Sequence, residues 1–96
     1  MYARVTPIRF PSSMCKEVSG AAEGLVSVLN EQRGYKGLNV LMDAVAGEGL
    51  IVSYWETEAN AEASEANPSY VAQMSMMSSF LQERLAPRTY QASIHA

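Results

Sequence analysis

The sequence predicts a single α+β domain with a ferredoxin-like fold, in which two helices cover one face of an antiparallel four-stranded sheet. Three observations predict it. Two apolar stretches are separated by a short turn with two glycines, segments of helical periodicity lie before and after this pair, and short extended segments stand at both ends of the chain. The order is strand, helix, strand, strand, helix, strand, and right-handed crossovers place both helices on the same face.

The first segment, Tyr2–Phe10 (YARVTPIRF), is predicted to form a strand. Val5 and Ile8, like the phenylalanine that ends the segment, favour the extended conformation. Pro7 has no N–H group to donate, so we expect it at a bulge or facing away from a neighbouring strand.

Residues 11–33 are predicted to form a helix, because their apolar residues recur every three or four positions. This face comprises Met14, Val18, Ala21, Ala22, Leu25, Val26 and Leu29. Ser12 or Ser13 is expected to cap the start of the helix, and Gly34 is expected to end it.

The central stretch, residues 34–57, is predicted to form a hairpin with the strands Leu38–Val45 and Leu50–Trp55. Gly47 and Gly49 are expected to supply positive φ angles in the turn between them. Both faces of this hairpin carry large apolar side chains. Helices can cover one face only, so the other face predicts association with a second copy of the chain.

Thr57 is expected to cap a helix that continues through residues 58–66, which are small and polar and are therefore expected to be exposed. Asn67 and Pro68 interrupt this helix. They are also expected to start a further helix, with the asparagine as its cap and the proline as its first residue.

That further helix, Ser69–Leu85, carries an apolar stripe that is expected to face the sheet. The stripe comprises Tyr70, Met74, Met77, Leu81 and Leu85, with Val71, Met76 and Phe80 beside it. Pro87 is expected to end the helix, and Arg88–His95 is predicted to form a short closing strand.

The composition excludes several classes of protein. A chain of 96 residues is predicted to be one domain, residues 1–96. Its net charge is −3 and its Lys and Arg residues are not clustered, so no basic patch for binding nucleic acid is expected. Cys15 is the only cysteine, so neither an intrachain disulfide nor a cysteine-based zinc site can form. No apolar run approaches the ~20 residues needed to cross a bilayer, and no signal segment opens the chain, so a cytoplasmic protein without membrane contact is expected.

Two motifs frame the hairpin: residues 33–37 (RGYKG) lead into it, and residues 52–57 (VSYWET) lead out of it into a helix. Together they resemble the antibiotic-biosynthesis-monooxygenase-like domains of the dimeric α/β-barrel superfamily, and the resemblance covers nearly all of the chain. It implies a homodimer in which two sheets face one another and enclose a barrel. It also implies a cleft between sheet and helices that holds an aromatic substrate or haem.

Haem degraders of this superfamily carry a histidine ligand on the second helix. The matching stretch here, Tyr70–Met77, contains no histidine, and the only one in the chain, His95, is expected in an exposed tail. This departure argues against haem chemistry. The resemblance still leaves open an oxygenase without cofactor or metal, because activated aromatic substrates can supply the electrons themselves. Such an enzyme needs a pocket that binds and deprotonates a phenol and shields a carbanion from water.

The candidate substrate-binding residues are Asn39, Ser53, Trp55, Tyr70, Met74 and Met77. Arg4 is a further candidate for binding a phenol. Each candidate also has a structural interpretation, since Trp55 can anchor the end of its strand and the stripe with Tyr70 can simply be core. Polar side chains inside a sandwich must be hydrogen-bonded, so Asn39 and Ser53 are either satisfied core residues or ligand contacts.

A shared floor is predicted for the two polar candidates. If the turn sets the register, Asn39 and Ser53 point the same way, on a floor of Leu41 and Ile51 beneath a roof of aromatic and methionine side chains. Two functions remain open. The chain is either a small cofactor-independent monooxygenase-like protein acting on or binding a polycyclic or quinol-type aromatic, or a non-catalytic, small-ligand-binding or stress-related dimer of the same fold.

Overall fold

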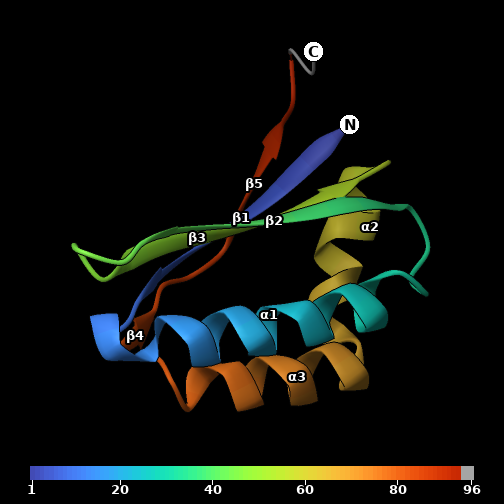
Figure 1. The fold of residues 1–96 in the computed structure, drawn as a ribbon. Coiled ribbons are helices and arrows are strands. Elements are labelled where there is room, and N and C mark those ends of the chain that lie inside the picture. Colours follow the sequence, from blue (N-terminus) through green and yellow to red (C-terminus); the bar gives the residue numbers. More distant parts are fainter. Residues whose placement is uncertain (94–96) are drawn as a thin grey trace.

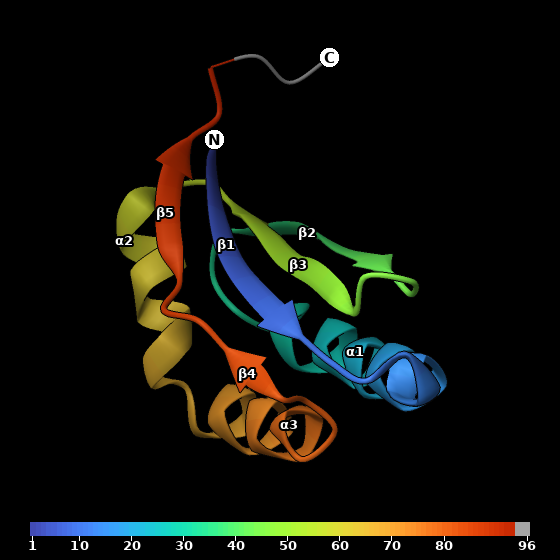
Figure 2. The same ribbon diagram turned by 90° about the vertical axis from the view of Figure 1, so that its left-hand side faces the viewer.

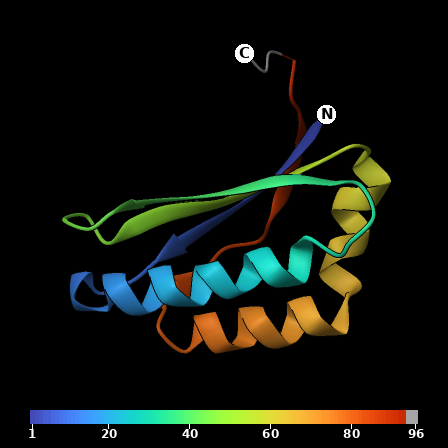
Figure 3. The ribbon, with the colours of Figure 1, turned by 45° about the vertical axis from the view of Figure 1, so that its right-hand side comes forward.

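The computed structural model describes residues 1–93 and has two layers, a sheet and a pair of helices (Figure 1). The helices α1 (Cys15–Leu29) and α3 (Pro68–Ser78) lie side by side under the sheet. The short α2 (Glu58–Ala63) stands at one end and connects the two layers (Figure 3). The predicted ferredoxin-like α+β fold, with helices on one face of an antiparallel sheet, is confirmed.

The sheet is built around its first strand. β1 (Tyr2–Arg9) lies between β3 (Glu48–Trp55) on one side and two short strands, β4 (Glu83–Arg84) and β5 (Arg88–Gln91), on the other (Figure 2). β2 (Tyr35–Asp43) pairs with β3 and forms the opposite edge. All of these pairs are antiparallel.

The C-terminal part of the chain pairs with one edge of β1 as two separate strands, and the break between them lies opposite Pro7. β4 pairs with Ile8 and Arg9, β5 pairs with residues 2–5, and between them only Leu85 N donates to Pro7 O, at 3.0 Å. Because proline has no N–H, the ladder cannot be completed there. The sequence predicted one closing strand, Arg88–His95. Its first four residues form β5, Ala92 and Ser93 are not in a strand, and His95 lies outside the described residues.

Helix α1 is shorter than predicted. It follows a 3-10 turn, η1 (Ser12–Met14), and ends at Leu29. Neither predicted serine caps it, since the residue at its start, Met14, makes no side-chain capping hydrogen bond. Gly34 has a φ of +80°, as a left-handed turn requires, but it lies beyond the end of the helix. The predicted face is buried except for Met14, which is partly buried, and Val26, which is exposed.

The N-terminus of α3 is as predicted. Asn67 Oδ1 accepts hydrogen bonds from Ser69 N at 2.9 Å and from Tyr70 N at 3.1 Å, and Pro68 occupies the first turn. Thr57 caps α2 in the same way, since Thr57 Oγ1 accepts from Asn60 N at 3.0 Å.

The helix predicted over Ser69–Leu85 was wrong in its C-terminal half. α3 ends at Ser78, because the chain turns back to pair with β1, where Gln82 N donates to Arg9 O at 2.8 Å. Leu85 consequently lies on the far face of the sheet and is exposed. The flanking residues Val71 and Met76, expected beside the buried stripe, are also exposed.

Residues 58–66 are not wholly exposed, contrary to expectation. Ala61 and Ser64 are buried where α2 and the following 3-10 turn, η2 (Ser64–Ala66), pack on the sheet. Small side chains suit this position because the helix approaches β1 and β3 closely.

The two glycines near the β2–β3 turn have different roles: Gly47 allows a backbone conformation with positive φ, and Gly49 lets two strands approach closely. Gly47 has a φ of +69°, as predicted, whereas Gly49 does not have a positive φ. A Cβ at Gly49 would lie 2.5 Å from Leu41 O, so its role is close approach of the strands. Asp43 Oδ1 accepts hydrogen bonds from two amides of the turn, Val45 N at 3.1 Å and Ala46 N at 3.0 Å.

We call the side of the sheet that packs on α1 and α3 the inner face, and the other side the open face. The core lies between the inner face and the helices and contains Ile8, Phe10, Val18, Leu25, Leu29, Ile51, Trp55, Tyr70, Met74 and Met77. The open face carries exposed Leu41, Leu50, Leu85 and Tyr90. Within residues 1–93, no helix has both the length and the apolar character of a membrane span.

Candidate functional site

The tryptophan at the end of β3 is held rigidly on the inner face. Trp55 is completely buried, and its Nε1–H donates to Ser53 Oγ at 2.8 Å. The two side chains share a face because they are two residues apart on one strand. The ring of Tyr35 meets the indole edge-on, with a centroid separation of 5.7 Å. The indole is therefore fixed both by a buried hydrogen bond and by aromatic packing.

The predicted roof comes from α3. Tyr70, Met74 and Met77 all lie in the buried cluster that contains Trp55. Burial raises the pKa of the Tyr70 hydroxyl to about 12, and the charge of Glu65 adds to this rise, whereas Arg84 and Arg4 oppose it. Near neutral pH this phenol stays protonated. It can donate a hydrogen bond but cannot act as a general base.

Asn39 does not join this group, and the predicted shared floor was wrong. In the β2–β3 register, Asn39 is opposite Val52 and Ser53 is opposite Leu38. Opposite residues point to the same side, so Asn39 lies on the open face and is exposed. Leu41 is also on the open face, while Ile51 faces the core.

Side chains fill the space between the inner face and α3. One hollow of about 560 Å³ lies on the open face near the β2–β3 turn and is lined by Pro7, Leu41, Leu50 and Leu85 among others. A second, of about 290 Å³, lies between the end of α1 and the start of α3. Neither is lined by Ser53, Trp55 or Tyr70. The predicted residues other than Asn39 are thus brought together as packed core.

A polar cluster borders this core beneath α2 and α3, on the inner face of β1 and β5. Arg4 Nε lies 3.1 Å from Glu65 Oε1, and Arg4 Nη1 donates to Thr89 Oγ1 at 2.6 Å. Thr6, the next inner-face residue of β1, is buried. Arg4 was a candidate from the sequence, and the alternation of β1 could have shown Thr6. Glu65 was missed because the 58–66 segment was expected to be fully solvated, and Thr89, on the predicted closing strand, was not singled out as a candidate.

The described residues provide no metal site, because none of the His, Cys, Asp and Glu side chains in 1–93 gather in groups of three or more.

Comparison with known proteins defines the fold. No protein-family model matches the sequence, and no curated protein matches it. A structure from Bordetella bronchiseptica, named as a candidate antibiotic biosynthesis monooxygenase, superposes with a TM-score of 0.84 at 13% identity and covers 97% of each chain. A similarly named structure from Nitrosomonas europaea has a TM-score of 0.79 at 13% identity, covering 96% of this chain and 89% of its own.

The chain has the antibiotic-biosynthesis-monooxygenase-like fold. The haem degrader MhuD from Mycobacterium tuberculosis, solved with two haems in its active site, also shares it, with a TM-score of 0.76 at 12% identity and coverage of 100% of this chain and 99% of its own. The resemblance inferred from the two motifs around the hairpin is therefore confirmed for the fold. In this monooxygenase-like fold the Ser53–Trp55 pair stands at the end of β3, beside the helix layer.

Proposed function

We propose that this protein is a small, cofactor-independent monooxygenase-like protein that acts on or binds a polycyclic or quinol-type aromatic molecule. The observation that carries the proposal is the Trp55 indole, fixed by Ser53 at 2.8 Å within a cluster that also contains Tyr70. A rigid aromatic wall opposite a phenol donor suits a flat ring that carries an oxygen.

The roof is suited to admit such a ring. Met74 and Met77 are buried in the core between α3 and the sheet. Methionine is unbranched and adopts several rotamers at low cost, so these side chains can move aside for a planar ligand more readily than branched residues. We place the bound ring between Trp55 and α3, in the volume that the methionine side chains occupy in the free protein.

The chemistry needs no resident cofactor. An anthrone or quinol that has given up its acidic proton to solvent before it binds is an electron-rich carbanion that reduces oxygen directly. One oxygen atom enters the product, and the other leaves as water with the two hydrogens that the substrate loses. Tyr70 stays protonated and would donate to the substrate oxygen, while the nearby guanidinium of Arg4 would favour the phenolate form. The packed layers would keep water from the carbanion.

We also propose that the open face is covered by a second copy. Leu41 is 53% exposed and Leu50 is 37% exposed in the single chain, and they line the hollow of about 560 Å³ together with Leu85. Contiguous exposed apolar surface of this kind is typical of an interaction site. The resulting homodimer would leave the inner face of each protomer available to its own ligand.

Oxygen uptake tests the catalytic proposal. The purified protein, free of flavin and metal, is mixed with an anthrone or a naphthoquinol in an oxygen electrode. Uptake above the spontaneous rate is expected, and Trp55→Phe should reduce it at least tenfold while an exposed substitution, Ser19→Ala, leaves it unchanged. Uptake equal to the spontaneous rate for every quinol tested would rule out catalysis on this substrate class.

The non-catalytic alternative is favoured by a specific observation. The inner layer is filled with side chains, and Tyr70, the titratable residue among the buried members of this core, has a raised pKa that disqualifies it as a base. Quenching of the single tryptophan by a quinone, without oxygen uptake from the corresponding quinol, would favour this non-catalytic, ligand-binding function.

A further inference from the structure

The side chains of the open face lie in rows that run across the strands. Residues directly opposite one another in an antiparallel ladder point to the same side, so each row takes one residue from each strand. The row nearest the β2–β3 turn, which we call the charged row, comprises Asp43, Glu48, Arg9 and Glu83. The next row, the apolar row, comprises Leu41, Leu50, Pro7 and Leu85. The third row comprises Asn39, Val52, Val5 and Arg88.

The charged row has an excess of negative charge. Arg9 Nη2 lies 4.0 Å from Glu48 Oε1, so these two charges offset one another. Asp43 and Glu83 are exposed and have no cation partner among residues 1–93. The charged row therefore presents two unmatched carboxylates, one on the β2 edge of the sheet and one on the β4 edge.

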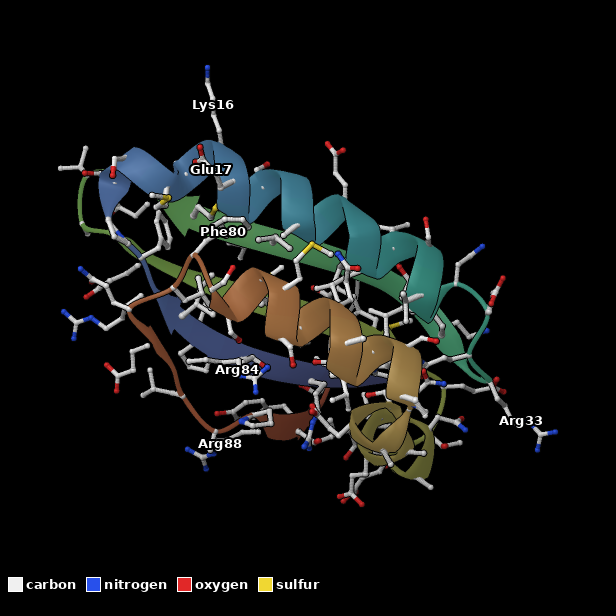
Figure 4. The ribbon with its side chains drawn as sticks, turned by 90° about the horizontal axis from the view of Figure 1, so that it is seen from below. Lys16, Glu17, Arg33, Phe80, Arg84 and Arg88 are labelled. Carbon is white, nitrogen blue, oxygen red and sulfur yellow. The ribbon has the colours of Figure 1, made fainter. Side chains whose placement is uncertain are left out.

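The third row ends in an unmatched cation. Arg88 is exposed at the edge of the sheet, clear of both long helices (Figure 4), and its guanidinium carbon lies 5.5 Å from the centroid of the Tyr90 ring. In the described part of the chain no carboxylate pairs with it. Arg88 and Glu83 pair with residues of β1 that are four positions apart, which is about 13 Å along the strand. This edge thus carries a cation and an anion that do not meet within one chain.

The rows restrict how two open faces can stack. A twofold axis that relates two stacked sheets lies between them and parallel to both. If the axis runs across the strands, along the apolar row, the apolar row of each copy packs on its own equivalent and each charged row meets the third row of the other copy. If the axis runs along the strands, the two charged rows meet, and carboxylates oppose carboxylates. Like charges in contact disfavour this second arrangement.

The first arrangement also brings the unmatched charges together. With the axis across the strands, each strand faces its own equivalent, so Glu83 of one protomer lies over Arg88 of its partner. The reciprocal pair forms on the other side of the axis. Stacked sheets lie about 10 Å apart with strand directions within about 30° of one another, a gap that a glutamate and an arginine side chain span together.

We infer that the open face pairs with a second copy of the chain about a twofold axis along the apolar row, with Arg88 of each protomer in an ion pair with Glu83 of its partner. The inference rests on the homodimer proposed above, and adds its symmetry and the charges that set its orientation. The exposed leucines of the apolar row supply the contact area, and the complementary charges fix the register.

An exchange of charges tests the pairing. The variants are Arg88→Glu, Glu83→Arg and the double variant with both changes. Lys16→Glu is the matched control, because Lys16 projects from α1 on the opposite side of the molecule from Arg88 (Figure 4). Sedimentation velocity over a dilution series gives the dimer dissociation constant of each protein, and circular dichroism checks that each protomer is folded. All three positions are exposed, so the fold should be kept.

Each single reversal is expected to raise the dissociation constant at least tenfold, because it creates two like-charge contacts in every dimer. The double variant should return to within about threefold of wild type, since it restores both pairs in reverse. An equal mixture of Arg88→Glu and Glu83→Arg should form a heterodimer, because each then meets an opposite charge. Lys16→Glu should behave as wild type. Rising salt should weaken the wild-type dimer.

Two results would overturn the inference, and they are distinguishable. If the wild type dimerises but neither single reversal changes the dissociation constant, this orientation fails while the homodimer stands. If the wild type stays monomeric at every concentration tested, the proposed homodimer fails and the inference falls with it.

Discussion

At the scale of single residues, the Ser53–Trp55 hydrogen bond is the feature on which the candidate site depends. Ser53→Ala is expected to lower the free energy of unfolding by about 1–3 kcal/mol, because the indole N–H would stay buried without an acceptor. Chemical denaturation measures the loss, and near-UV circular dichroism of the single tryptophan reports its change of environment. Ser19→Ala, on the exposed side of α1, is the control and should be neutral. An unchanged spectrum and stability for Ser53→Ala would contradict the fixed indole.

Tyr70 provides a prediction about pH. Its folded-state pKa is raised to about 12 from the ordinary value of 10, so the folded protein holds this proton more tightly than the unfolded chain does. The associated stability is fully present below pH 10 and is lost as the pH rises toward 12. Thermal melts between pH 8 and 12 should therefore show a steeper loss for wild type than for Tyr70→Phe. Parallel curves for the two proteins would show that the hydroxyl is not buried as described.

At the scale of elements, Asn67 and Pro68 define the start of α3. Asn67→Ala should cost about 1 kcal/mol in free energy of unfolding, because two amides in the first turn lose their acceptor. Pro68→Ala should be near neutral, because the first residue of a helix has no intrahelical partner for its N–H. Denaturant titrations of the two variants give both values. A larger loss for Pro68→Ala than for Asn67→Ala would contradict this description of the helix start.

Helix starts and turns that depend on the chemistry of one or two residues could be predicted from the sequence. Asn67 and Thr57 start helices because their side chains accept hydrogen bonds from amides in the first turn, and Pro68 fits the first helical position. Gly47 marks a turn because its backbone adopts a positive φ. The end of α3 could not be predicted in this way. Leu81 and Leu85 continue a helical period, but pairing of residues 83–84 with β1 outweighs that local preference.

The placement of Asn39 could not be predicted for a related reason. Both faces of the hairpin are apolar, so the hydrophobic pattern does not say which face is buried, and register alone decides. In the observed ladder, the odd-numbered residues from Gly37 to Asp43 of β2 share a face with even-numbered residues of β3, which separates Asn39 from Ser53. The other five candidates lie on the inner side, because Ser53 and Trp55 follow one strand and Tyr70, Met74 and Met77 follow one helix stripe.

At the scale of the whole molecule, the open face predicts the assembly. Light scattering at micromolar concentration should give twice the chain mass of 10.5 kDa. Leu41→Lys should shift the protein toward the monomer, because it would place a charge in the apolar contact, whereas Val71→Lys on the exposed side of α3 should not. A wild-type protein that stays monomeric at these concentrations would contradict the proposed homodimer.

The central claim is that a flat aromatic ligand enters between Trp55 and α3. A crystal structure of the protein with 1-hydroxy-2-naphthoate tests it most directly. We predict electron density for the ring against the Trp55 indole, with the Met74 and Met77 side chains displaced from their positions in the free protein and the Ser53 hydrogen bond intact. Density for the ligand in the open-face hollow beside Leu41 and Leu50, with the inner layer unchanged, would contradict the account.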